Sequence, residues 1–249
     1  MITDNSTKEV PFKYDALVYL IPLLLVFSLW SVYWVEYAFG FNFNRWGIYP
    51  RTLKGLRGVL FSPFIHSGIA HLFNNSVPVF VLLASLLYFY RKVAYKIFFY
   101  GMLLTGLLTW IIARPAYHIG ISGVIYMLFS FIFFSGIIRK YYRLVALSLV
   151  VVFLYGGMVW YLFPIKTDIS WEGHLSGFIV GLFFVFYYRN QGPQAQKYVF
   201  HKTEFDTYFD EDGNFVPPQP EEEELEENST LPTENKRVVN YILKKEEPD

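Results

Sequence analysis

Ser122 and His174 are the two side chains whose types suit nucleophilic catalysis, and each lies at the start of an apolar stretch of the chain. Ser122 lies between two glycines in the stretch Gly120-Ile121-Ser122-Gly123. A serine hydroxyl becomes a good nucleophile when a neighbouring base takes its proton, and a neutral imidazole suits that task near neutral pH. The two residues are therefore a candidate Ser-His dyad.

His71 and Asn75 could complete such a site. They are four residues apart near the start of another apolar stretch, so on a helix they share one face. Acyl transfer from a peptide bond passes through a tetrahedral oxyanion, which hydrogen-bond donors stabilise. An imidazole, a side-chain amide and the backbone N–H of Ser122 are suitable donors.

The residues that are missing exclude other chemistry. The sequence has no carboxylate between Glu36 and Asp168 and no cysteine at all. The sequence therefore lacks the residues that an aspartyl protease, a zinc protease with a His-Glu-x-x-His helix or an enzyme with a thiol nucleophile requires. It implies no metal or organic cofactor. Glu172 is two residues before His174 and points elsewhere on a helix, which favours a dyad over a triad. His66 and His118 are expected in loops, in structural or surface positions.

The elements that must position these residues are membrane-spanning helices. The chain has 249 residues, of which 54% are apolar and 21% aromatic, a composition typical of a membrane protein. Six segments lack any charged residue and are near the length of about 20 residues that crosses a bilayer as a helix. They are residues 16–35, 71–90, 97–113, 120–138, 144–165 and 173–188. The sequence predicts an all-α bundle of six transmembrane helices.

The charge pattern predicts the orientation and the domain boundaries. Basic residues gather before the first span, in the loops after the second and fourth spans and after the sixth span, which predicts that both termini are cytoplasmic. Residues 1–189 hold 15 basic and 6 acidic residues (+9), and residues 190–249 hold 6 and 15 (−9). We expect a short cytosolic N-terminus at 1–15, a membrane domain at 16–189 and a largely disordered acidic tail at 190–249. Nothing in this balance favours nucleic-acid binding.

This orientation brings the candidate residues together. With a cytoplasmic N-terminus, the second, fourth and sixth spans all begin on the external side. His71 and Asn75, Ser122, and His174 would then lie at a similar depth, a few residues below the outer surface.

Three separated motifs occur in this order along the chain: His-x-x-x-Asn from His71, Gly-x-Ser-Gly from Gly120, and Gly-His-x-x-Gly-x-x-x-Gly from Gly173. Together they resemble the rhomboid family of intramembrane serine proteases over roughly residues 16–189. The resemblance implies a six-helix fold in a bacterial cytoplasmic membrane, contact with the lipid bilayer, and cleavage of transmembrane protein substrates. It leaves the oligomeric state open.

The resemblance also implies roles for individual residues. Ser122 would be the nucleophile, His174 the general base, and Tyr126 the ring against which the histidine packs. His71 and Asn75 would serve the oxyanion, together with the backbone of Ser122. Gly120 and Gly123 would shape the serine turn, and Gly177 and Gly181 would allow close contact between the fourth and sixth spans.

Two other classes of function stay open. One is a rhomboid-like binding protein or chaperone that holds membrane clients without cutting them, against which the presence of both Ser122 and His174 argues. The other is a transporter, which predicts inverted-repeat symmetry that the sequence does not display.

Overall fold

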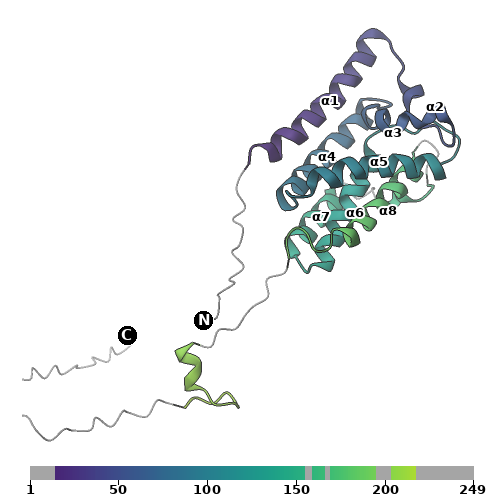
Figure 1. The fold of residues 1–249 in the computed structure, drawn as a ribbon. Helices are drawn as coiled ribbons and strands as arrows, with labels where there is room; N and C mark the ends of the chain where they lie inside the picture. The colour runs from purple at the N-terminus through teal and green to yellow at the C-terminus, as the bar shows by residue number, and fades with distance from the viewer. Residues whose placement is uncertain (1–14, 155–158, 166–168, 195–202, 217–249) are drawn as a thin grey trace, which may run out of the picture. The chain divides into compact units, whose positions relative to one another are not determined.

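The computed structural model describes residues 15–154, 159–165, 169–194 and 203–216, and these residues are predominantly helical (Figure 1). Within them, β-structure is limited to two isolated bridges, Ile48 to His118 and Phe209 to Phe215. The main helices are α1 (Leu17–Phe39), α4 (Ile69–Phe89), α5 (Ala94–Ile112), α6 (Ser122–Ile138), α7 (Tyr142–Leu154) and α8 (Trp171–Tyr187).

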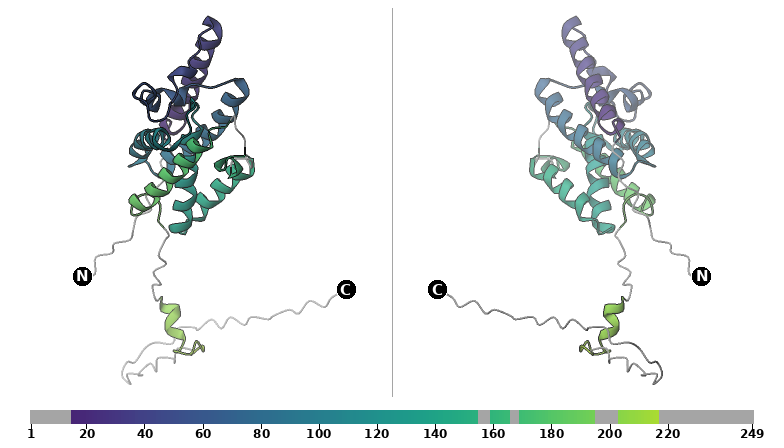
Figure 2. Two further views of the ribbon diagram at one scale, coloured as in Figure 1. Left: turned by 90° about the vertical axis from the view of Figure 1, so that its right-hand side faces the viewer. Right: turned by 90° about the vertical axis from the view of Figure 1, so that its left-hand side faces the viewer.

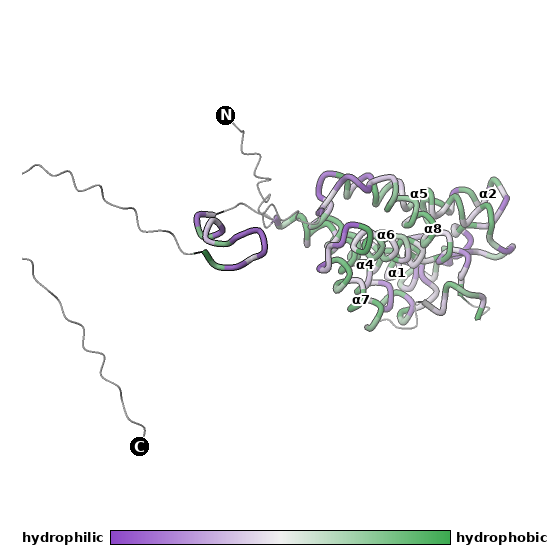
Figure 3. The backbone as a smooth tube through the Cα atoms, turned by 90° about the horizontal axis from the view of Figure 1, so that it is seen from below, coloured by the Kyte–Doolittle hydropathy of each residue, from purple (hydrophilic) through white to green (hydrophobic). Residues whose placement is uncertain are grey.

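Among the described residues, three helices are long and apolar enough to cross a membrane. They are α1, α4 and α5, with 23, 21 and 19 residues. The apolar helices α6 and α8 are shorter, with 17 residues each. Figure 3 shows hydrophobic residues along the helices and hydrophilic stretches mainly at their ends. The chain is an integral membrane protein by these criteria, while the full count of six spans stays a prediction.

The fifth apolar segment differs from the sequence prediction. A single helix over residues 144–165 is wrong, because α7 ends at Leu154 and residues 159–162 form the short 3-10 helix η3 (Val159–Leu162). Gly156 and Gly157 follow α7 in the sequence, and glycine disfavours a helix interior. Residues 155–158 lie outside the described part. A separate short element, η3, therefore lies in the chain between α7 and α8, which carries His174.

The core lies around α6. Eleven of its residues are buried, among them Met127, Leu128 and Phe131, which are fully enclosed. Helix α8 packs along α6, while α1 lies at the edge of the bundle against α4 (Figures 1 and 2). Helix α1 leaves large apolar side chains such as Phe27 exposed, as expected for a helix that faces lipid. Ser122, at the start of α6, is thus attached to the most enclosed helix.

The first loop folds back over the end of α5. It contains η1 (Asn44–Trp46), α2 (Leu53–Leu56), α3 (Gly58–Phe61) and η2 (Ser62–Phe64). The Trp110 indole N–H donates to the Thr52 carbonyl at 2.9 Å, and Ile48 and His118 exchange backbone hydrogen bonds. The loop supports the segment that leads into Ser122.

A second compact unit comprises residues 198–249, of which 203–216 are described. It contains η4 (Glu204–Tyr208), whose start has a capping box between Thr203 and Asp206. Asp210 then accepts hydrogen bonds from the backbone N–H groups of Asp212 and Asn214 in a turn. Local side-chain caps therefore support the short helix and the turn of this segment, while a largely disordered acidic tail over 190–249 stays a prediction. The glutamate-rich run at 221–227 lies outside the described residues.

Candidate active site

Ser122 and His174 are in direct contact. The distance from Ser122 Oγ to His174 Nε2 is 2.9 Å, although the two residues are 52 positions apart in the sequence. Ser122 is the first residue of α6 and half-buried, and His174 is in the first turn of α8 and 6% exposed. The packing of α6 against α8 therefore creates this pair.

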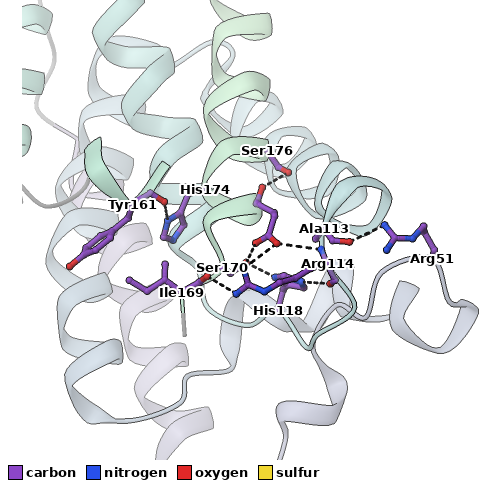
Figure 4. Close-up of polar contacts among 10 residues, drawn as sticks. Arg51, Ala113, Arg114, His118, Tyr161, Ile169, Ser170, His174 and Ser176 are labelled. Carbon is purple, nitrogen blue, oxygen red and sulfur yellow. Dashed lines mark hydrogen bonds and ion pairs between the residues drawn. The ribbon is translucent and has the colours of Figure 1, made fainter. Parts of the chain in front are cut away.

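The other ring nitrogen of His174 determines its tautomer. Nδ1 lies 2.9 Å from the carbonyl oxygen of Tyr161, in η3 (Figure 4). A carbonyl oxygen only accepts hydrogen bonds, so Nδ1 carries the proton and Nε2 presents its lone pair to the Ser122 hydroxyl. This is the arrangement that a general base requires.

Tyr126 fixes the plane of the imidazole. Its ring is stacked on that of His174, with the centroids 4.2 Å apart and 15° between the planes. Tyr126 is buried and lies one helical turn after Ser122 on α6. A buried ring at this position restricts rotation of the histidine side chain.

Gly120 brings His71 and Asn75 close to the serine turn. Its backbone φ is +101°, in the left-handed region that favours glycine. A Cβ atom at this position would lie 3.0 Å from His71 Nε2 and 3.7 Å from Asn75 Nδ2. The two side chains therefore border the chain two residues before Ser122, and a larger residue at Gly120 would displace them.

His71 and Asn75 differ in their hydrogen bonds. His71 Nδ1 is 3.1 Å from the Ser67 hydroxyl, which leaves Nε2 on the side of Gly120. Asn75 is 6% exposed, and its Nδ2 group has no hydrogen-bond partner among the described residues. A buried amide donor without a partner is costly, which is typical of a group kept for a transient ligand. Asn74, by contrast, is exposed.

Three glycines allow the close approach of α6 and α8. A Cβ atom at Gly177 would overlap the carbonyl oxygen of Gly123, and one at Gly181 would overlap the Ser130 side chain and the Met127 carbonyl. A Cβ at Gly123 would lie 3.0 Å from the Gly173 carbonyl oxygen. The small residues therefore set the distance at which the serine and histidine helices meet.

A small cavity borders the serine. Its volume is about 30 Å³, and Ser122, Gly123, Ser62, His118 and Ser170 contribute to its lining. Water needs roughly 10–15 Å³ of such space and polar partners, so this cavity has room for it. The hydroxyls and the imidazole supply the partners.

Sequence reasoning missed several groups around this site. The Tyr161 carbonyl belongs to the main chain, so no residue type marks it. Arg114 and Glu172 form an ion pair, which the prediction of a Ser-His dyad without a carboxylate does not include. His66 and His118 are both buried. The opposite charges at two span ends were the signal that could have revealed the ion pair.

The fold and the site together are those of an integral membrane protein with a candidate Ser-His dyad at the starts of two helices. Comparison with known families agrees with this description. A model of the Rhomboid domain matches residues 54–191. The chain belongs to the rhomboid family, whose members are generally intramembrane serine proteases.

Relatives of this chain occur in mycobacteria. The chain is 34% identical over 175 residues to the uncharacterized protein Rv1337 of Mycobacterium tuberculosis, which covers 64% of this chain and 70% of the relative. The same values hold for the uncharacterized protein Mb1372 of Mycobacterium bovis. The uncharacterized protein ML1171 of Mycobacterium leprae is 32% identical over 142 residues, covering 51% of this chain and 54% of that protein.

Proposed function

We propose that this protein is an intramembrane serine endopeptidase that cleaves other membrane proteins in or near their transmembrane segments. The observation that carries the proposal is the 2.9 Å contact between Ser122 Oγ and His174 Nε2, with Nδ1 held by the Tyr161 carbonyl. A hydroxyl that only held two helices together would not need an imidazole oriented in this tautomer.

In the first step, Ser122 attacks the scissile carbonyl carbon while His174 Nε2 takes its proton. The C–N bond then breaks, the imidazolium returns its proton to the leaving amine, and an acyl-enzyme remains. In the second step, the imidazole removes a proton from water, which attacks the ester carbonyl carbon. The ester C–O bond then breaks, the imidazolium returns its proton to Ser122 Oγ, and the acid product leaves. The cavity beside Ser122 provides space for this water.

The tetrahedral intermediate requires donors near the serine. The first N–H groups of α6 have no partner within the helix and carry its positive dipole end, at Ser122 itself. His71 Nε2 and Asn75 Nδ2, both beside Gly120, are the side-chain donors. For this role Nε2 of His71 carries the proton, and the Ser67 hydroxyl donates to Nδ1.

The proposal includes a setting in the bilayer. Six spans with both termini in the cytoplasm place Ser122 close to the external surface, where water reaches it. The substrate is a transmembrane segment that unwinds locally, because a peptide bond within a regular helix is shielded from attack. Enzyme and substrate then lie in the same lipid bilayer.

The test is cleavage of a model transmembrane substrate by purified enzyme in detergent. We expect the wild type to cleave and to react with a fluorophosphonate probe at Ser122. Ser122→Ala should abolish both activities, and His174→Ala should abolish cleavage, with the thermal unfolding of each variant near that of the wild type. Cleavage by Ser122→Ala would contradict the mechanism. A folded wild type that neither cleaves nor reacts would instead support a client-binding protein.

A further inference from the structure

A polar network connects the two segments that carry the catalytic pair. Glu172, 2% exposed in the first turn of α8, forms an ion pair with Arg114 in the loop between α5 and α6. Arg114 Nη1 lies 3.2 and 3.3 Å from the two carboxylate oxygens, and the Arg114 backbone N–H is 3.3 Å from one of them. Arg114 Nη2 also donates to the Ile169 carbonyl at 2.9 Å (Figure 4).

His118 makes a second connection between the same two segments. Its Nε2 is 3.0 Å from the Arg114 carbonyl, which only accepts, so Nε2 carries the proton. Nδ1 therefore accepts from the Ser170 hydroxyl at 2.6 Å, at the residue that precedes α8 (Figure 4). Burial lowers the pKa of His118, which favours the neutral ring that these two bonds require.

The position of this network is what makes it relevant to the reaction. The loop that holds Arg114 and His118 leads directly into Ser122, and the turn that holds Glu172 also holds His174. The glycine contacts along α6 and α8 set how closely the helices approach, but contacts between small apolar surfaces resist sliding and rotation weakly. Directional bonds to a buried charge determine the rotation and height of the first turn of α8.

We propose that Glu172 is a positioning residue that, through its ion pair with Arg114, holds α8 where His174 Nε2 meets Ser122 Oγ. Glu172 touches neither reacting atom, because its carboxylate faces Arg114. This inference rests on the proposed endopeptidase function. Its physical basis is that a displacement of about 1 Å between reacting groups costs on the order of 100-fold in rate.

The test compares Glu172→Ala and Glu172→Gln in the full-length enzyme. The fluorophosphonate probe counts the reactive serines, and substrate cleavage gives kcat per reactive serine and KM. We expect Glu172→Ala to lower kcat per reactive serine roughly 10- to 100-fold with KM changed less than about twofold. Glu172→Gln, which keeps an acceptor for Arg114, should lose less. This partial rescue also keeps the proposal testable if the alanine variant does not fold.

Arg51 offers a matched control. Arg51 belongs to the first loop, and its guanidinium donates to the carbonyls of Ile111 and Ala113 at 2.9 Å each. The bond to Ala113 holds the start of the loop between α5 and α6 (Figure 4). Arg51→Gln removes guanidinium-to-carbonyl contacts of similar chemistry, one exposed and one partly buried, without touching the bonds between the loop and α8. We expect its kcat per reactive serine to stay within about twofold of the wild type.

The double variant tests whether the ion pair acts as a unit. If it does, Arg114→Ala and Glu172→Ala together lose no more activity than the worse single variant. Losses that multiply would overturn the proposal, as would a wild-type kcat per reactive serine in Glu172→Ala. A purely structural role would lower thermal stability and the number of reactive serines while leaving that kcat unchanged. If the wild type itself neither cleaves nor reacts, the proposed function fails instead.

Discussion

At the residue scale, a main-chain carbonyl holds the imidazole of His174. In Ser-His-Asp sites a carboxylate holds the histidine in the required tautomer and stabilises the imidazolium. Here the Tyr161 carbonyl supplies the tautomer, and the stacked ring of Tyr126 restricts the plane. A neutral oxygen stabilises the imidazolium less than a carboxylate does, so oxyanion stabilisation becomes a larger part of the proposed catalysis.

Asn75→Ala tests that part. Removal of one oxyanion donor raises the barrier by about 2.7–4 kcal/mol, which lowers kcat on the order of 100- to 1,000-fold. Because Asn75 Nδ2 has no hydrogen-bond partner among the described residues, the substitution should leave thermal stability nearly unchanged. Initial rates on the model substrate measure the effect. Asn74→Ala, at the neighbouring exposed residue, is the control, and an equal loss there would contradict the assignment.

At the element scale, the contact between α6 and α8 decides whether the pair forms. Gly177→Ala places a Cβ atom on the Gly123 carbonyl oxygen, so α8 must move away from α6. We expect kcat to fall by about 100-fold or more, because His174 is one turn away on the same helix, and thermal stability to fall with it. Ile179→Ala changes an exposed residue of α8 and should retain activity. An active, stable Gly177→Ala enzyme would show that the helices do not need this contact.

The segment before α4 predicts a dependence of stability on pH. Burial, and secondarily the nearby His71, lower the pKa of His66 from 6.5 to about 4. Because the unfolded chain binds the proton more readily, stability is complete above pH 6.5 and is lost as the pH falls towards 4. The shift corresponds to about 3 kcal/mol. Thermal unfolding of wild type and His66→Gln between these pH values measures it, and an equal slope in both proteins would exclude His66 as the cause.

At the scale of the whole molecule, the site belongs to the first compact unit, residues 1–197. A truncation after residue 197 should therefore keep cleavage in detergent within about twofold of the full-length chain. The truncation must keep the residues just beyond α8, because the buried Arg139 donates to the carbonyls of Tyr188 and Gln191. Loss of cleavage with normal thermal stability would assign the acidic tail a direct role in the reaction.

Much of the site could be predicted before the fold was known. Ser122, His174, His71 and Asn75 stand out because they are polar groups at the starts of apolar segments, in a chain without carboxylates between Glu36 and Asp168. The length of the segments without charged residues indicated helices, because the hydrocarbon of a bilayer permits few other structures. The residue types at the segment starts and the lengths of the apolar segments are local properties, so the sequence is enough to determine them.

The tertiary structure alone decided which main-chain carbonyl and which ion pair lie beside the two residues. The Tyr161 carbonyl reaches His174 because η3 turns back towards α8, and the ion pair of Arg114 and Glu172 forms because two distant span ends meet. Such contacts depend on how helices pack and where a helix stops, as at Leu154, and these outcomes arise from many weak interactions at once. The sequence by itself determined which residues have the chemistry for catalysis, and packing decided which partners orient them.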